Sequence, residues 1–61
     1  MKYYVINKSD GYVADYNPEE ASCEWVQNYR NAHKFWNEVD AFVARQKLHL
    51  GYAVIIEVVQ S

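Results

Sequence analysis

The sequence predicts a small α+β domain, in which an antiparallel sheet of three to four strands carries one helix on one face. Three observations lead to this fold class. Two β-branched and aromatic segments flank a turn near the N-terminus, a helix pattern with a capping residue follows, and a strongly β-prone run comes last. The predicted order is strand, strand, an optional short strand, helix, strand. One helix on one sheet face is the simplest architecture that buries this pattern.

The N-terminal segment predicts a β-hairpin. Strand character runs over residues 2–7, KYYVIN, and returns over residues 12–16, YVADY. The intervening KSDG has turn chemistry, because Ser and Asp bond their own backbone and Gly accepts a positive φ. Pro18 then interrupts the strand pattern, because it has no backbone N–H.

The segment 21–36 leaves two assignments open. Residues 23–26, CEWV, form a short third strand, or they belong to a helix that begins near Glu19, where Pro and acidic residues suit a first turn. We favour the short strand. Residues 31–35, NAHKF, predict a helical turn before the main helix.

The main helix is predicted to begin after Asn37 and to end near Leu50. Asn37 can cap its N-terminus, and Asp40 lies close to the positive end of the helix dipole. Gly51 suits the left-handed position that ends many helices. Residues 52–59, YAVIIEVV, then predict a strand.

The predicted helix carries two apolar stripes when its residues are spaced at about 100°. We expect the first stripe to cover the sheet, and it comprises Val39, Phe42, Val43, Gln46 and Leu50. The second stripe comprises Ala41, Ala44 and Leu48. These residues are either ordinary helix formers on the outside or a shallow docking site for another chain.

The predicted sheet has the same two-faced character. Alternation places the more charged set of side chains away from the helix. That set still contains large apolar residues, namely Tyr4, Ile6, Val13, Ile55 and Val59. Since one helix cannot cover both faces, this patch predicts a homodimer through the sheet face or through an edge strand. The alternative is that segment 21–36 folds across the open face and closes the core.

Length and composition narrow the class of protein. The 61 residues allow one domain, spanning 1–61, and 51% of them are hydrophobic. Cys23 is the one cysteine, so no internal disulfide forms and a reducing, cytoplasmic location is expected. The longest apolar run, YAVII, is far shorter than the roughly 20 residues of a membrane span.

The sequence holds no recognisable chemistry, so we expect no enzyme activity, no cofactor and no metal. His33 and His49 have no nucleophile arrangement around them, and Cys23 has no motif that pairs it with His33. The spacings typical of zinc and calcium sites are missing. With two glycines, the chain cannot form a familiar phosphate-binding loop.

Two further binding modes stay open beside protein–protein contact. The six tyrosines could stack single-stranded nucleic acid on a sheet face, but the net charge of −2 argues against a phosphate-binding surface. Alternatively, an acidic patch occupies a basic nucleic-acid-binding site on another protein. That patch comprises Asp10, Asp15, Glu19, Glu20 and Glu24.

A short pattern resembles a known group of proteins. A hairpin, Trp25, the AHKF turn at 32–35, Ala41 and the YAVIIEVV strand occur in this order. The chain resembles, over most of its length, a loose group of small phage and prophage proteins from Gram-positive bacteria, mostly of unknown function. The resemblance implies a compact accessory protein in the host cytoplasm that binds one host or phage protein and inhibits or modulates it. It brings no catalytic residues.

Overall fold

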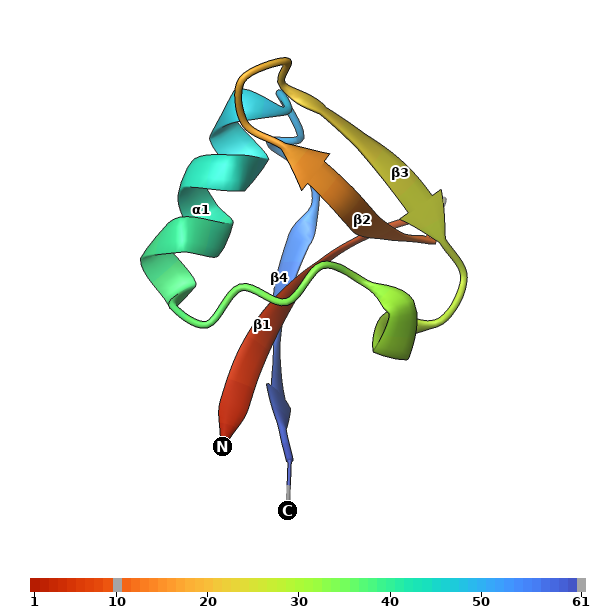
Figure 1. Ribbon diagram of the computed structural model, residues 1–61, viewed down its shortest axis with the longest axis vertical. Coiled ribbons are helices and arrows are strands. Elements are labelled where there is room, and N and C mark those ends of the chain that lie inside the picture. Colours follow the sequence, from red (N-terminus) through yellow and green to blue (C-terminus); the bar gives the residue numbers. More distant parts are fainter. Residues whose placement is uncertain (10, 61) are drawn as a thin grey trace.

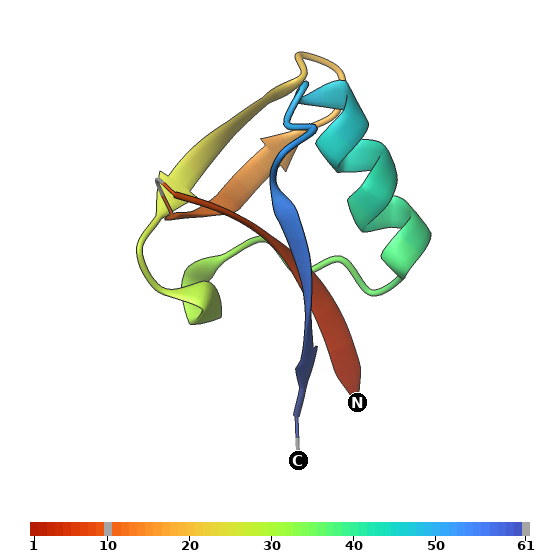
Figure 2. The ribbon, with the colours of Figure 1, turned by 180° about the vertical axis from the view of Figure 1, so that it is seen from behind.

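The computed structural model describes residues 1–9 and 11–60 and confirms the predicted α+β fold (Figure 1). The strands form one four-stranded antiparallel sheet in the order β3-β2-β1-β4. Helix α1 and the short 3₁₀ turn η1 lie on opposite sides of the β1–β4 pair, as Figure 2 shows from behind. The elements are β1 (Lys2–Lys8), β2 (Gly11–Asn17), β3 (Ser22–Val26), η1 (Tyr29–Asn31), α1 (Glu38–Lys47) and β4 (Val54–Val59).

The predicted hairpin forms from β1 and β2, and the preferred short third strand is present as β3. The described β1–β2 pairing is limited to Asn7 with Tyr12 and Lys8 with Gly11, next to the turn. Gly11 has a φ of 130°, and a Cβ built on it would lie 2.5 Å from the carbonyl oxygen of Val26. Only glycine fits this position without strain.

Beyond the turn, the chain after η1 lies between β1 and β2. The amide of Phe35 donates to the carbonyl of Tyr4 at 2.9 Å, and the amide of Tyr4 donates back to Phe35 at 2.7 Å. The amide of His33 donates to the carbonyl of Val13 on β2 at 2.9 Å. The predicted helical turn over 31–35 is therefore wrong. Residues 33–35 supply backbone partners to β1 and β2 where the two strands separate.

Helix α1 begins as predicted and ends differently. The side chain of Asn37 accepts a hydrogen bond from the amide of Val39 at 2.8 Å, which confirms the cap. At the other end His49, not Gly51, has the left-handed conformation, with a φ of 57°. The amides of His49 and Leu50 donate to Gln46 and Arg45, which is the Schellman pattern. This early reversal brings Leu50 into the core.

The predicted orientation of the helix is wrong, because α1 turns its small residues inward. Ala41 and Ala44 are fully buried, whereas Val39, Phe42 and Val43 are exposed. Residue volume explains the inversion. The sheet and the inserted segment already contribute the bulky Ile6, Val13 and Phe35 to this core, so alanines let the helix approach closely. Leu48 packs against the same cluster.

The sheet face under α1 is the face that we expected to be open. Ile6 and Val13 are fully buried there, and they cannot contact a partner. The predicted interaction surface is therefore wrong at these two positions and at Ala41 and Ala44. Of the remaining members of the predicted surface, Tyr4, Leu48 and Ile55 are half-buried. Val59 is 71% exposed.

Segment 21–36 closes the other sheet face, as in the alternative arrangement. Tyr3 and Val5 are buried with Ala32, and η1 lies beside them. The ring of Trp36 meets Tyr3 edge-on at 5.8 Å, and the ring of Tyr29 meets Tyr12 at 6.4 Å. The chain therefore covers the central part of both sheet faces itself.

Candidate interaction surface

The outer face of α1 and the residue before its cap expose a continuous set of large apolar side chains. Trp36 is 57% exposed, Val39 65%, Phe42 44% and Val43 42%. At about 100° per residue, Val39, Phe42 and Val43 fall within one sector of about 100° on the helix, and Trp36 lies just before the cap. We call Trp36, Val39, Phe42 and Val43 the outer stripe. Ordinary amphipathic helices bury such residues, so the outer stripe is a candidate contact surface.

A groove runs along one side of the outer stripe, between α1 and the segment 33–36. Its volume is about 380 Å³. Val43 lines it from α1, His33 and Trp36 line it from the segment, and Tyr16 lines it from β2. Pro18, Lys34, Phe35, Asp40 and Lys47 complete the lining. An aromatic floor of this kind suits a partner's apolar side chain.

Three rings build the floor of that groove. The ring of His33 lies 4.5 Å from that of Phe35, and Tyr16 lies 5.9 Å from His33 and 5.8 Å from Phe35. Tyr16 reaches this side because β2 has an irregularity between Ala14 and Asn17, where Asp15 has a φ of 47°. A bulge of this kind reverses the alternation of side chains that follow it.

A smaller groove, of about 240 Å³, borders the outer stripe on the opposite side. Ile55 of β4 forms its wall, together with Glu38, Val39 and Phe42. The ring of Phe42 is held in place by Arg45, whose guanidinium carbon lies 5.1 Å from the ring centroid. Arg45 also donates from Nη1 to the carbonyl of Ala53 at 3.1 Å. Phe42 contacts Arg45 and still presents apolar surface to solvent.

Charged residues frame the outer stripe in a regular way. Glu38 and Asp40 lie in the first turn of α1, and Arg45 and Lys47 lie in the last turn. Negative charge is favourable at the N-terminal end of the helix dipole, and positive charge is favourable at the C-terminal end. The surface thus has an apolar centre and a polar rim, which is the usual anatomy of a protein–protein interface.

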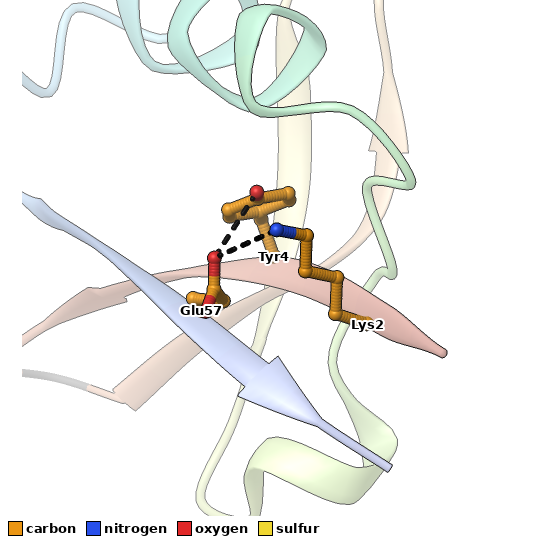
Figure 3. A network of polar contacts seen from close by, with 3 residues as sticks. All are labelled: Lys2, Tyr4 and Glu57. Carbon is orange, nitrogen blue, oxygen red and sulfur yellow. Dashed lines mark hydrogen bonds and ion pairs between the residues drawn. The ribbon is translucent and has the colours of Figure 1, made fainter.

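Tyr4, one of the predicted contact residues, belongs to a polar network at the edge of the sheet. Its hydroxyl donates to the Glu57 carboxylate at 3.2 Å, and the Lys2 ammonium lies 3.5 Å from the same oxygen (Figure 3). The negative charge of Glu57, with Tyr4 second, raises the pKa of Lys2. This exposed network joins side chains of the paired strands β1 and β4.

The predicted acidic patch lies on the β2–β3 side of the molecule. Four of its five members are exposed, namely Asp15, Glu19, Glu20 and Glu24. The fifth, Asp10, lies outside the described residues. Asn17 organises the turn, because its side-chain oxygen accepts from the amides of Glu19 at 3.0 Å and Glu20 at 3.3 Å. The patch is therefore open to solvent, and its binding to a basic nucleic-acid-binding site on another protein remains a prediction.

The tyrosines that we considered for base stacking are distributed differently from the expectation. Tyr3 is almost completely buried, and Tyr12 is half-buried against Tyr29. Tyr52 is the most exposed of the described tyrosines, at 72%, and it lies in the loop before β4. Lys8 lies between it and Trp25, with Nζ 5.3 Å and 5.2 Å from the two ring centroids.

The described residues were also considered for a metal site, a reactive thiol and a membrane-spanning helix. Residues 1–9 and 11–60 contain no group of three or more His, Cys, Asp and Glu side chains placed to hold a metal ion. Burial, and then the negative charge of Glu24, raise the pKa of the half-buried Cys23 thiol. Within the part of the chain that the structure describes, no helix has the length and apolar character that crossing a membrane requires.

Comparisons with protein-family models, with curated proteins and with solved structures gave no match to this chain. The candidate surface therefore stands on its own geometry.

The sequence pattern grouped Val39, Phe42 and Val43 on one apolar stripe, which was predicted to lie in the core. The signal that could have corrected this is the sum of side-chain volumes. A core that already receives the side chains of Ile6, Val13 and Phe35 has little room for Val39, Phe42 and Val43 as well.

Proposed function

We propose that this protein acts by binding another protein chain, without catalytic chemistry of its own, and that the outer stripe of α1 is its binding surface. One observation carries the proposal: a helix that buries Ala41 and Ala44 while it exposes Val39, Phe42 and Val43. A chain selected for folding alone has no reason to leave its larger apolar residues in water.

The energetics favour a partner of moderate affinity. Complete burial of a side chain of this size is worth about 1.5–3 kcal/mol. The four residues of the outer stripe are each about half exposed. Covering them thus contributes roughly 3–6 kcal/mol, against an association cost of about 4–15 kcal/mol. Polar contacts with the charged rim and the filling of the two grooves supply the remainder.

The resemblance to small phage and prophage proteins supports a host or phage protein as the partner, whose activity the binding inhibits or modulates. Either partner would meet the same outer stripe. A nucleic-acid partner is less well supported, since Tyr3 and Tyr12 are covered by segment 29–36.

Site-specific photo-cross-linking tests the proposal. A benzophenone amino acid replaces Val39 in cells that naturally produce the protein, and adducts are analysed after irradiation. We expect adducts with a small number of protein species. The matched control is Val54, which is 57% exposed on β4, next to Ile55 and on the opposite side of the strand. A yield at Val39 no higher than that at Val54 would contradict the proposal.

A further inference from the structure

We infer that the outer stripe pairs with the outer stripe of a second copy of this chain, with the two α1 helices antiparallel about a two-fold axis. The inference rests on the proposed function and assigns the outer stripe to a second copy of the chain in place of a different host or phage protein. A two-fold interface requires a surface that is complementary to itself.

The charged residues at the rim of α1 attract those of a second α1 helix when the two helices run antiparallel, and repel them when the helices run parallel. Its first turn is acidic and its last turn is basic. Antiparallel pairing places the acidic turn of each helix beside the basic turn of the other, and the helix dipoles oppose each other as well. Parallel pairing would instead place acid beside acid and base beside base.

The spacing of the charges fits an axis that passes between Phe42 and Val43. With a rise of 1.5 Å per residue, Asp40 and the partner's Lys47 then differ by about 3 Å in height, whereas the two Asp40 residues differ by about 7.5 Å. Asp40 and Lys47 lie on the same flank of the outer stripe, two turns apart. The same separation of about 3 Å holds for Glu38 and the partner's Arg45.

The apolar residues fit this axis too. Phe42 meets the partner's Val43 at the centre, and Val39 lies one turn further out on each side. Trp36, at the rim, extends past the last turn of the opposite helix. The exposed face of each ten-residue helix would therefore contribute one half of a small apolar core between the two copies.

Sedimentation equilibrium of the purified chain tests the pairing, over a range from about 1 μM to about 1 mM. We expect a reversible monomer–dimer equilibrium in the micromolar range. Val39→Asp should weaken it at least tenfold, while the matched Val54→Asp leaves it within about twofold. Circular dichroism shows whether each variant is folded. A wild-type chain that remains monomeric throughout overturns the inference.

A charge exchange tests the antiparallel geometry independently of the apolar contacts. Asp40→Lys and Lys47→Asp should each weaken the dimer about tenfold, because each places like charges together twice. The double variant D40K/K47D should recover most of the wild-type affinity. Glu24→Lys, on β3, makes the same change of net charge as Asp40→Lys and should have little effect. A double variant as weak as the single variants overturns the inference.

The two proposals fail in different ways. If the purified chain is a monomer and Val39 still gives adducts with other proteins, the inference is wrong and the proposed function stands. If Val39 gives adducts with neither its own chain nor another, the proposed function is wrong.

Discussion

Tyr4 and Phe35 exchange two backbone hydrogen bonds, of 2.7 and 2.9 Å, although 31 positions of sequence separate them. This pairing inserts the chain after η1 into the sheet. It also directs the ring of Phe35 under α1, where it packs with Ile6, Val13 and the two helix alanines. The position of the helix, and thus the exposure of its outer stripe, depends on this ring.

Phe35→Ala is expected to destabilise the fold by about 3–5 kcal/mol, because it leaves a large cavity beneath α1. A domain of this size has little more stability than that, so the variant should be largely unfolded. Urea denaturation followed by tryptophan fluorescence measures the effect. Tyr52→Ala, at a position that is 72% exposed, should cost less than about 1 kcal/mol. Equal losses for the two variants would contradict the placement of Phe35.

Gly11→Ala and Gly51→Ala should have clearly different effects on stability. At Gly11 the new Cβ meets the carbonyl oxygen of Val26 at 2.5 Å in a left-handed backbone region, so we expect a loss of about 1–3 kcal/mol. At Gly51 nothing lies within 4 Å of the new Cβ. The substitution there should be neutral or stabilise by up to about 1 kcal/mol, through the unfolded state. The two midpoints of thermal unfolding should therefore move in different directions or by clearly different amounts.

The inverted helix makes a further prediction. Ala44→Leu should destabilise the fold by about 1–3 kcal/mol, since a fully buried methyl group is replaced by a larger side chain. Val43→Leu, one residue earlier on the exposed side, should change stability by less than about 0.5 kcal/mol. Chemical denaturation of both variants distinguishes this orientation from the one that we predicted from sequence, which would give the reverse order.

The thiol of Cys23 should titrate differently in the folded and unfolded chain. Burial, with Glu24 second, raises its pKa in the folded state, while Lys8 opposes the shift. Because the folded pKa lies above the unfolded one, this group contributes stability below the unfolded pKa and loses it as the pH rises through the folded pKa. The rate of alkylation by iodoacetamide follows the thiolate, so its midpoint should lie at a higher pH in the folded chain than in urea. Coincident midpoints would contradict the prediction.

The parts of the fold that depend on local signals could be predicted from the sequence. The hairpin follows from its turn residues, the helix start follows from Asn37, and the last strand follows from its β-branched run. The end of the helix was missed by two residues, because burial of Leu50 outweighed the preference for glycine at a left-handed position.

The parts that depend on distant segments could not be predicted. No local pattern shows that His33 and Phe35 will bond to β2 and β1, since the need arises only where those strands separate. The choice between the two faces of α1 depends on how much volume the sheet contributes to the core. For that reason four buried residues, Ile6, Val13, Ala41 and Ala44, were predicted to lie on the interaction surface. Val39, Phe42 and Val43 were correctly grouped on one stripe but were placed in the core.

The sheet joins the two ends of the described chain, because β1 pairs with β4 from Lys2 opposite Val59 to Asn7 opposite Val54. Together with the Tyr4–Phe35 pairing, this gives a topology rich in distant contacts, and domains of that kind fold in milliseconds to seconds rather than in microseconds. Neither the hairpin nor α1 has a sufficient core until β4 arrives. Refolding should therefore be a single slow step, and the β-prone run of β4 is exposed to solvent until that step is complete.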